Sequence, residues 1–143
     1  MISIHEIKAE DTYPIRKKEL RENIDLPEKF RGDLDNSTFH LGLFENDILV
    51  SVVSFMRSDF ESLKGNQYQL RGMATLKAYQ KKGYGQKLVE EADKLLKKKN
   101  VNIVWCNARI VALDFYKKQG YKKIGEEFDI PQIGGHYVMY KNL

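Results

Sequence analysis

The sequence predicts an α/β fold of the α+β kind, a single domain with a mixed, mostly antiparallel sheet of about six or seven strands flanked by helices. The element order, read from apolar periodicity, is strand, helix, three strands, helix, strand, helix, two strands. A turn signal at Glu45-Asn46-Asp47 joins two β-rich runs as a hairpin, which makes antiparallel neighbours. The strand–helix–strand passages make parallel ones. The length of 143 residues suits one domain over residues 1–143.

The first elements are a strand and a helix. Isoleucines near alternation in residues 1–7 predict the strand. A helix is predicted over 12–24, with Thr12 as N-cap and Pro14 in its first turn. Residues 25–37 then form a loop or a short helix.

Three predicted strands follow, over residues 38–44, 48–56 and 67–76. The first two form the hairpin, and the polar segment 57–66 links them to the third. The third strand ends at a glycine-containing turn.

The second half of the chain begins with the clearest helix. After Gly85, apolar residues recur at helical i, i+3, i+4 and i+7 spacings: Leu88, Val89, Ala92, Leu95 and Leu96. A continuous β-branched run predicts a strand over 101–108, and a helix over 110–120 is stopped by Gly120. The remaining residues form two strands around the loop 131–135.

Composition narrows the class of partner. The chain has 24 Lys and Arg against 20 Asp and Glu, a net charge of +4, which fits an anionic small molecule at least as well as nucleic acid. The N-terminal residues lack the apolar region of a secretory signal, and no stretch approaches the ~18 apolar residues of a membrane span. We therefore expect a cytoplasmic protein without a membrane partner. Cys106 is alone, so no internal disulfide and no cysteine zinc cluster can form, and no metal is expected.

The segment from Gln80 to Gly85 lies where a strand passes into a helix. A helix begins with unpaired backbone N–H groups and a partial positive charge, and glycines let the backbone approach a ligand closely. Lysines surround the turn: Lys77, Lys81, Lys82 and Lys87. The pattern predicts phosphate binding. The alternative is a sharp turn on a lysine-rich surface. The common nucleotide motifs are absent, because position 88 is Leu and no G-x-x-x-x-G-K-[ST] occurs.

Three motifs in order resemble the GNAT superfamily of acyl-CoA-dependent N-acyltransferases. Q-x-x-G-x-G after a strand is similar to its pyrophosphate-binding motif, and Asn107 at the end of a strand is followed by "ALDFYKKQGYKKIGEEF", similar to its F-Y-x-x-x-G-[FY] segment. "FHLGLFENDILVSVVSF" and "EEFDIPQIGGHYVMYK" resemble the ElaA-like group of small single-domain members. The resemblance covers nearly the whole chain. It implies a GNAT-like domain with a splayed cleft between the central parallel strands, as a monomer or homodimer.

The resemblance also implies acetyl-CoA as cosubstrate and a set of cofactor-binding residues. The backbone of the strand before the turn would pair with the pantetheine arm, and Gly72 is a candidate for the bulge that splays this strand. The turn would hold the pyrophosphate. By carry-over, the cofactor-binding residues are Met73, Ala74, Thr75, Gln80, Lys81, Lys82, Gly83, Tyr84, Gly85, Gln86, Asn107 and Phe115.

Tyr116 is the predicted catalytic residue, an acid for the thiolate that leaves when an amine attacks the thioester. The alternative role of Tyr116 is core packing. The base stays open between His136, His40 and a water relay, because the strand position where some members carry glutamate reads Gln69-Leu70-Arg71. Cys106 lies in an apolar strand, which favours an inert buried thiol over a nucleophile.

The predicted reaction is acetyl transfer to a primary amine of an unidentified small molecule or protein, by direct attack in a ternary complex. A non-catalytic acyl-CoA-binding module is the alternative. Nucleic-acid binding through the lysine-rich helix is disfavoured, since Glu90, Glu91 and Asp93 interrupt it. Acidic residues could draw a cationic amine, or form an ordinary solvated face: Asp59, Glu61, Glu126, Glu127 and Asp129.

Overall fold

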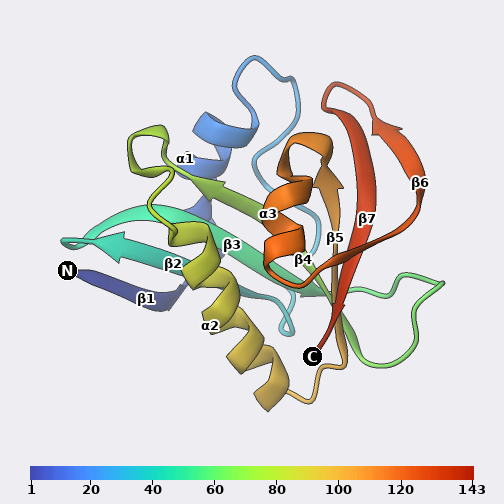
Figure 1. The fold of residues 1–143 in the computed structure, drawn as a ribbon. Coiled ribbons are helices and arrows are strands. Elements are labelled where there is room, and N and C mark those ends of the chain that lie inside the picture. The colour runs from blue at the N-terminus through green and yellow to red at the C-terminus, as the bar shows by residue number, and fades with distance from the viewer.

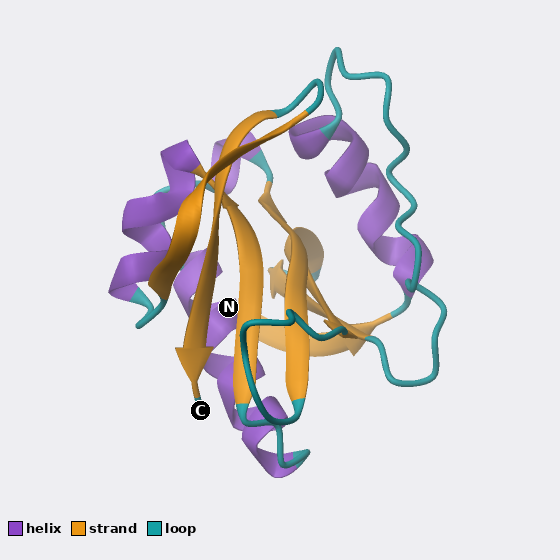
Figure 2. Cartoon of the chain, turned by 90° about the vertical axis from the view of Figure 1, so that its right-hand side faces the viewer, coloured by secondary structure: helices purple, strands orange, loops and turns teal.

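The computed structural model describes residues 1–143 as a seven-stranded sheet with helices on both faces (Figure 1). The strand order is β1-β2-β3-β4-β5-β7-β6, and only the β4–β5 pair is parallel. α1 packs on one face, and α2 and α3 cover the other (Figures 1 and 2). The elements are β1 (Ile2–Ile7), α1 (Ala9–Leu20), β2 (Phe39–Glu45), β3 (Ile48–Arg57), β4 (Gln67–Thr75), the 3-10 turn η1 (Lys77–Tyr79), α2 (Tyr84–Lys98), β5 (Ile103–Arg109), the 3-10 turn η2 (Ile110–Ala112), α3 (Leu113–Lys118), β6 (Lys122–Ile130) and β7 (Gly134–Asn142).

This architecture confirms the predicted fold class and element order. The hairpin between β2 and β3 turns at Asn46 and Asp47, whose φ angles are +50° and +70°. Two successive positive φ values are typical of the type I′ turn that matches the twist of paired strands.

The boundaries of two predicted helices were wrong. α1 begins at Ala9, three residues before the predicted N-cap, and ends at Leu20 instead of residue 24. Thr12 lies inside the helix, and its buried hydroxyl donates to the Ala9 carbonyl at 2.6 Å. The start is fixed instead by Asp11, whose carboxylate accepts the Lys8 N–H at 3.0 Å. The predicted helix 110–120 is a 3-10 turn followed by a short α-helix, Leu113–Lys118.

α2 packs on the sheet through the face that its periodicity predicts. Leu88, Val89, Ala92 and Leu96 are at most 1% exposed and join the main core cluster with residues of β2 to β5. Lysines and glutamates occupy the exposed face of α2. None of the helices is both long and apolar enough to cross a membrane.

β4 and β5 separate after a short parallel contact. Only Gln67–Gln69 pair with Ile103–Trp105, so the later residues of β4 have no partner on that side. On its other side β4 carries a bulge, because the register steps from Val52↔Ala74 to Ser54↔Arg71. The predicted irregularity at Gly72 is confirmed.

Gly72 cannot be replaced without strain at this bulge. Its φ is +62°, and a Cβ there would lie 2.9 Å from both Arg16 Nε and Phe30 Cε2. Both the backbone angle and the space therefore require glycine.

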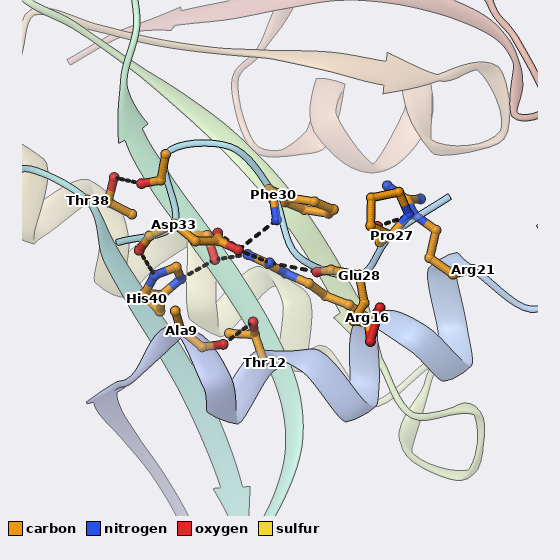
Figure 3. Close-up of polar contacts among 12 residues, drawn as sticks. Ala9, Thr12, Arg16, Arg21, Pro27, Glu28, Phe30, Asp33, Thr38 and His40 are labelled. Atoms are coloured by element: carbon orange, nitrogen blue, oxygen red, sulfur yellow. Dashed lines mark hydrogen bonds and ion pairs between the residues drawn. The ribbon is translucent and has the colours of Figure 1, made fainter. Parts of the chain in front are cut away.

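A long loop, residues 21–38, runs beside α1 and is fixed to the sheet by a buried ion pair (Figures 2 and 3). Arg16 is fully buried and donates to both carboxylate oxygens of Asp33, at 2.8 and 3.0 Å, and to Ser54 Oγ at 2.8 Å. Asp33 also accepts the Phe30 N–H at 2.8 Å. This network therefore sets the position of Phe30 over the split between β4 and β5.

Candidate active site

A cleft of about 580 Å³, here called the larger cleft, opens between the end of β4, the glycine turn and α3. Ten of the twelve predicted cofactor-binding residues line it: Met73, Ala74, Thr75, Gln80, Lys81, Gly83, Tyr84, Gly85, Gln86 and Phe115. The structure thus brings together residues of β4, the turn and α3 that lie up to 42 positions apart in the sequence, from Met73 to Phe115. Lys82 and Asn107 do not line this cleft.

The glycine turn presents unpaired backbone donors to the larger cleft. Lys81 and Gly83 have φ values of +65° and +79°, and Gly83 is the N-cap of α2 without a side chain to cap it. The first helical hydrogen bond is from the Lys87 N–H to the Gly83 carbonyl, at 3.1 Å. The N–H groups of the three preceding helical residues are therefore free to bind an anion.

Two side chains of the turn have structural roles that the sequence did not reveal. The Tyr84 ring is buried in the main core, and its hydroxyl donates to the Glu45 carboxylate at the end of β2. This hydrogen bond raises the pKa of Tyr84 to about 12 and lowers the pKa of Glu45. Gln80 Nε2 donates to the Thr75 carbonyl at 2.9 Å. Tyr84 and Gln80 therefore fasten the turn to the sheet, which keeps its backbone donors in place.

A second space of about 220 Å³, here called the smaller cavity, lies between β4 and β5 where they separate. Gln69, Arg71 and Gly72 of β4 face Cys106 and Asn107 of β5 across it. The residues that line both the smaller cavity and the larger cleft are Leu20, Met73, Ala112 and Tyr116. The two spaces therefore meet beside Tyr116.

Tyr116 is buried but open to the site. Its ring contacts Phe115 and Tyr121 edge to face, with centroids 5.1 and 5.3 Å apart. The Tyr116 hydroxyl makes no hydrogen bond within the protein, yet it is not among the enclosed atoms that lack a partner, which are Arg16 Nε and Tyr121 Oη. It therefore keeps access to the cavity. Burial raises the pKa of Tyr116 well above its ordinary value. The phenol is thus protonated at neutral pH and suited to donate a proton.

The two candidate histidines lie in different places. His136 of β7 lines the smaller cavity, and its Nδ1 donates to the Gly134 carbonyl at 2.7 Å, which leaves the Nε2 lone pair free. His40 lines neither space, and its two ring nitrogens contact Ser54 Oγ and the Asp33 carbonyl (Figure 3). Of the two, only His136 is placed to act on a group in the cavity.

The charge in the smaller cavity argues against one of the two roles considered for the acidic residues, that of drawing a cationic amine. None of the five acidic residues considered for drawing a cationic amine lines it. Arg21, Arg71 and Arg109 line it instead. They are far apart in the sequence, and only the β4–β5 split and the loop after α1 bring them together. Cys106 also faces this cavity, and burial raises the pKa of its thiol, which keeps it an inert thiol.

A sheet split between its parallel strands, with a glycine turn and a helix N-terminus beside the split, defines the acyltransferase class that the sequence motifs resemble. The model of the acetyltransferase (GNAT) domain matches residues 7–134, so the chain belongs to this family and is a transferase.

Known proteins agree with this assignment. The "Uncharacterized N-acetyltransferase YitI" of Bacillus subtilis (strain 168) is 41% identical over 145 aligned positions, which cover 100% of this chain and 97% of that protein. The crystal structure of Escherichia coli ElaA has a TM-score of 0.82 at 18% identity, covering 99% of each chain. An aminoglycoside 6'-N-acetyltransferase complexed with coenzyme A has a TM-score of 0.78 at 13% identity, covering 98% of this chain and 96% of that one. These two structural likenesses concern the fold.

Proposed function

We propose that this protein transfers an acetyl group from acetyl-CoA to a primary amine, with residues 1–143 acting as one catalytic domain. The observation that carries the proposal is the meeting of the larger cleft and the smaller cavity beside Tyr116. A cofactor arm from one side and an amine from the other would meet there. The solved neighbour that contains coenzyme A supports this use of the fold.

The larger cleft offers coenzyme A positive charge, free backbone N–H donors and an unpaired strand edge. The free N–H groups at the start of α2 and the Lys81 side chain would bind the pyrophosphate. After Gln69, no residue of β4 pairs with β5, so the backbone groups on that side of β4 form no strand ladder, although the Thr75 carbonyl accepts from Gln80 Nε2. The pantetheine arm would use these groups at Met73, Ala74 and Thr75, as an added strand does.

The proposed chemistry is a direct attack. The amine nitrogen, in the smaller cavity, bonds to the thioester carbonyl carbon and gives its extra proton to His136 Nε2. The carbon–sulfur bond breaks, and Tyr116 donates its proton to the departing thiolate. Asn107 lines the smaller cavity, so its predicted contact with the cofactor would be at the acyl end. A non-catalytic binding module is less well supported, because it does not need an open cavity beside Tyr116.

Acetyl-CoA binding is the first test. A ligand that binds only the native state stabilises it by about 2.7 kcal/mol at a hundred times its Kd, which raises the midpoint of thermal unfolding by roughly 5–10 °C. We expect this rise to grow with acetyl-CoA concentration in a thermal shift assay. An unchanged midpoint at millimolar acetyl-CoA would contradict the proposal.

Gly83→Ala should weaken coenzyme A binding, and Gly125→Ala is its matched control. Both glycines have nearly the same φ, +79° and +78°, and a Cβ at either would meet no atom within 4 Å. The strain on the free protein is therefore similar, but only Gly83 faces the larger cleft. We expect Kd for coenzyme A, measured by calorimetry, to rise about 10-fold or more only for Gly83→Ala, since distortion of the turn misplaces its N–H donors. Equal Kd values for the two variants would place the phosphate site elsewhere.

A further inference from the structure

The smaller cavity has cationic walls and no acidic ones. Arg21 from the loop after α1, Arg71 from β4 and Arg109 from the end of β5 line it, together with His136, and no Asp or Glu does. These guanidinium groups come from three separate segments, so their convergence is a property of the folded cavity.

The three arginines lack the partners that usually neutralise such groups. The ion pairs of the chain are Arg16–Asp33, Lys82–Glu45 and Lys141–Asp93, and none involves Arg21, Arg71 or Arg109. Arg21 donates only to the backbone carbonyls of Pro27 and Leu20. Arg71 and Arg109 make no side-chain hydrogen bond within the protein, so their N–H donors are available in the cavity.

Burial and repulsion between neighbouring guanidinium groups lower the pKa of arginines at this site. Burial and the neighbouring Arg109 and Arg71 lower the pKa of Arg21. Burial and Arg16 lower the pKa of Arg71, and the Asp33 carboxylate offsets only part of this shift. A guanidinium stays protonated even so, and the cluster therefore keeps its charge at a cost in free energy. An anionic group bound among the arginines would relieve that cost.

Stacking on Phe30 does not account for the cluster. The guanidinium carbons of Arg71 and Arg21 lie 4.6 and 5.3 Å from the centre of the Phe30 ring. Such a contact stabilises the cation through the face of the guanidinium and leaves the N–H groups, which lie in its plane, unsatisfied. Arg109 has no aromatic contact of this kind and no hydrogen-bond or ion-pair partner within the protein.

We infer that the acceptor is a small primary amine that also carries a carboxylate, such as a free amino acid, with its carboxylate held by Arg71 and Arg109 and its amine directed to Tyr116 and His136. The inference rests on the proposed function and names its substrate class. A guanidinium binds a carboxylate through two parallel hydrogen bonds. The volume of about 220 Å³ is below the ~300–1,000 Å³ of pockets for larger ligands. A polycationic amine, such as an aminoglycoside, would be repelled by the same walls.

The first experiment compares matched acceptors. CoA release from acetyl-CoA is measured with the twenty amino acids and with amines that lack the carboxylate: methylamine against glycine, cadaverine against lysine, and phenethylamine against phenylalanine. We expect at least one amino acid to exceed its decarboxylated partner about 10-fold or more in kcat/KM. Phosphoethanolamine against ethanolamine tests a phosphate source of the negative charge.

The second experiment removes one arginine at a time. Arg71→Met and Arg109→Met should each raise KM for that amino acid by about 10–100-fold, the loss expected for a charged hydrogen bond. KM for the decarboxylated amine and the thermal shift with acetyl-CoA should stay nearly unchanged. Arg57→Met is the matched control, because Arg57 is exposed at the end of β3 and lines neither space. If one variant fails to fold, the other still decides the result.

The outcomes separate the two proposals. A protein that acetylates other amines but no amino acid, or prefers the decarboxylated amines or phosphoethanolamine, overturns the inference and leaves the proposed function in place. Equal KM values in the parent, Arg71→Met and Arg109→Met also overturn the inference. A protein that binds acetyl-CoA but acetylates no amine supports the non-catalytic binding module and overturns both proposals. A protein that neither binds acetyl-CoA nor acetylates any amine overturns the proposed function itself.

Discussion

Tyr116→Phe should lower kcat by roughly 10–10⁴-fold while the Kd for acetyl-CoA changes little. The substitution removes one hydroxyl and keeps the ring that packs against Phe115 and Tyr121. Proton donation to the departing thiolate stabilises the transition state and not the bound cofactor, so the loss falls on turnover. Steady-state kinetics with an accepted amine, together with calorimetry for acetyl-CoA, measure both quantities.

Tyr121→Phe is the control for this experiment. The Tyr121 ring contacts Tyr116, but its hydroxyl is fully enclosed without a hydrogen-bond partner and lines neither space. Removal of an unsatisfied buried hydroxyl should leave kcat near the parental value and stability equal or higher. Near-parental turnover in a folded Tyr116→Phe protein, where chemistry limits the rate, would remove Tyr116 from the mechanism.

The raised pKa of Tyr116 also gives this experiment a pH signature. The protonated phenol is the active form, and its activity is lost only as pH rises through the folded-state pKa, which lies well above the ordinary 10.0. The parent should therefore show no loss of kcat from this group below about pH 10.

Asp33→Ala should lower the free energy of unfolding by about 3–5 kcal/mol, as for other buried ion pairs that lose one partner. The substitution leaves the fully buried Arg16 guanidinium without its carboxylate and also removes the acceptor of the Phe30 N–H. Urea denaturation measures the loss. Asp35→Ala is the control, because Asp35 is exposed in the same loop and its side chain makes no hydrogen bond or ion pair.

A double substitution sharpens the test. When both charged groups of a buried pair are replaced by apolar ones, stability is often retained. Arg16→Met combined with Asp33→Leu should therefore recover much of the stability that Asp33→Ala loses. A loss below 1 kcal/mol in Asp33→Ala would show that the pair does not hold the loop in place.

Local patterns in the sequence predicted the sheet, the clearest helix and the glycine turn. α2 follows from apolar residues such as Leu88 and Leu96 at helical spacing, and the bulge at Gly72 follows from a glycine inside a strand. Both features depend on residues that are close together in the chain, so the local sequence is enough to predict them. The start of α1 was missed because Thr12 has the chemistry of an N-cap, although its hydroxyl binds the backbone inside the helix.

Features that depend on distant contacts could not be predicted. Tyr84 was predicted to contact the cofactor, and only its hydrogen bond to Glu45 of β2 shows that its side chain fastens the turn to the sheet. For the acidic residues near the strands, the sequence left open a cation site or an ordinary solvated face. Arg21, Arg71 and Arg109 line one cavity only after the loop folds over β4. Their separation in the chain leaves no periodic signal.

The short contact between β4 and β5 gives the sheet two inner edges in addition to its outer edges, β1 and β6. Unpaired strand edges on a protein surface can form hydrogen bonds with strands of other molecules, which promotes aggregation. Here the inner edges lie between α3 on one side and the loop that carries Phe30 on the other. A strand from another folded copy could pair with these inner edges only by displacing α3 or this loop. The backbone left unpaired at the split is thus enclosed within the fold, unlike the backbone of β1 and β6 at the outer edges of the sheet.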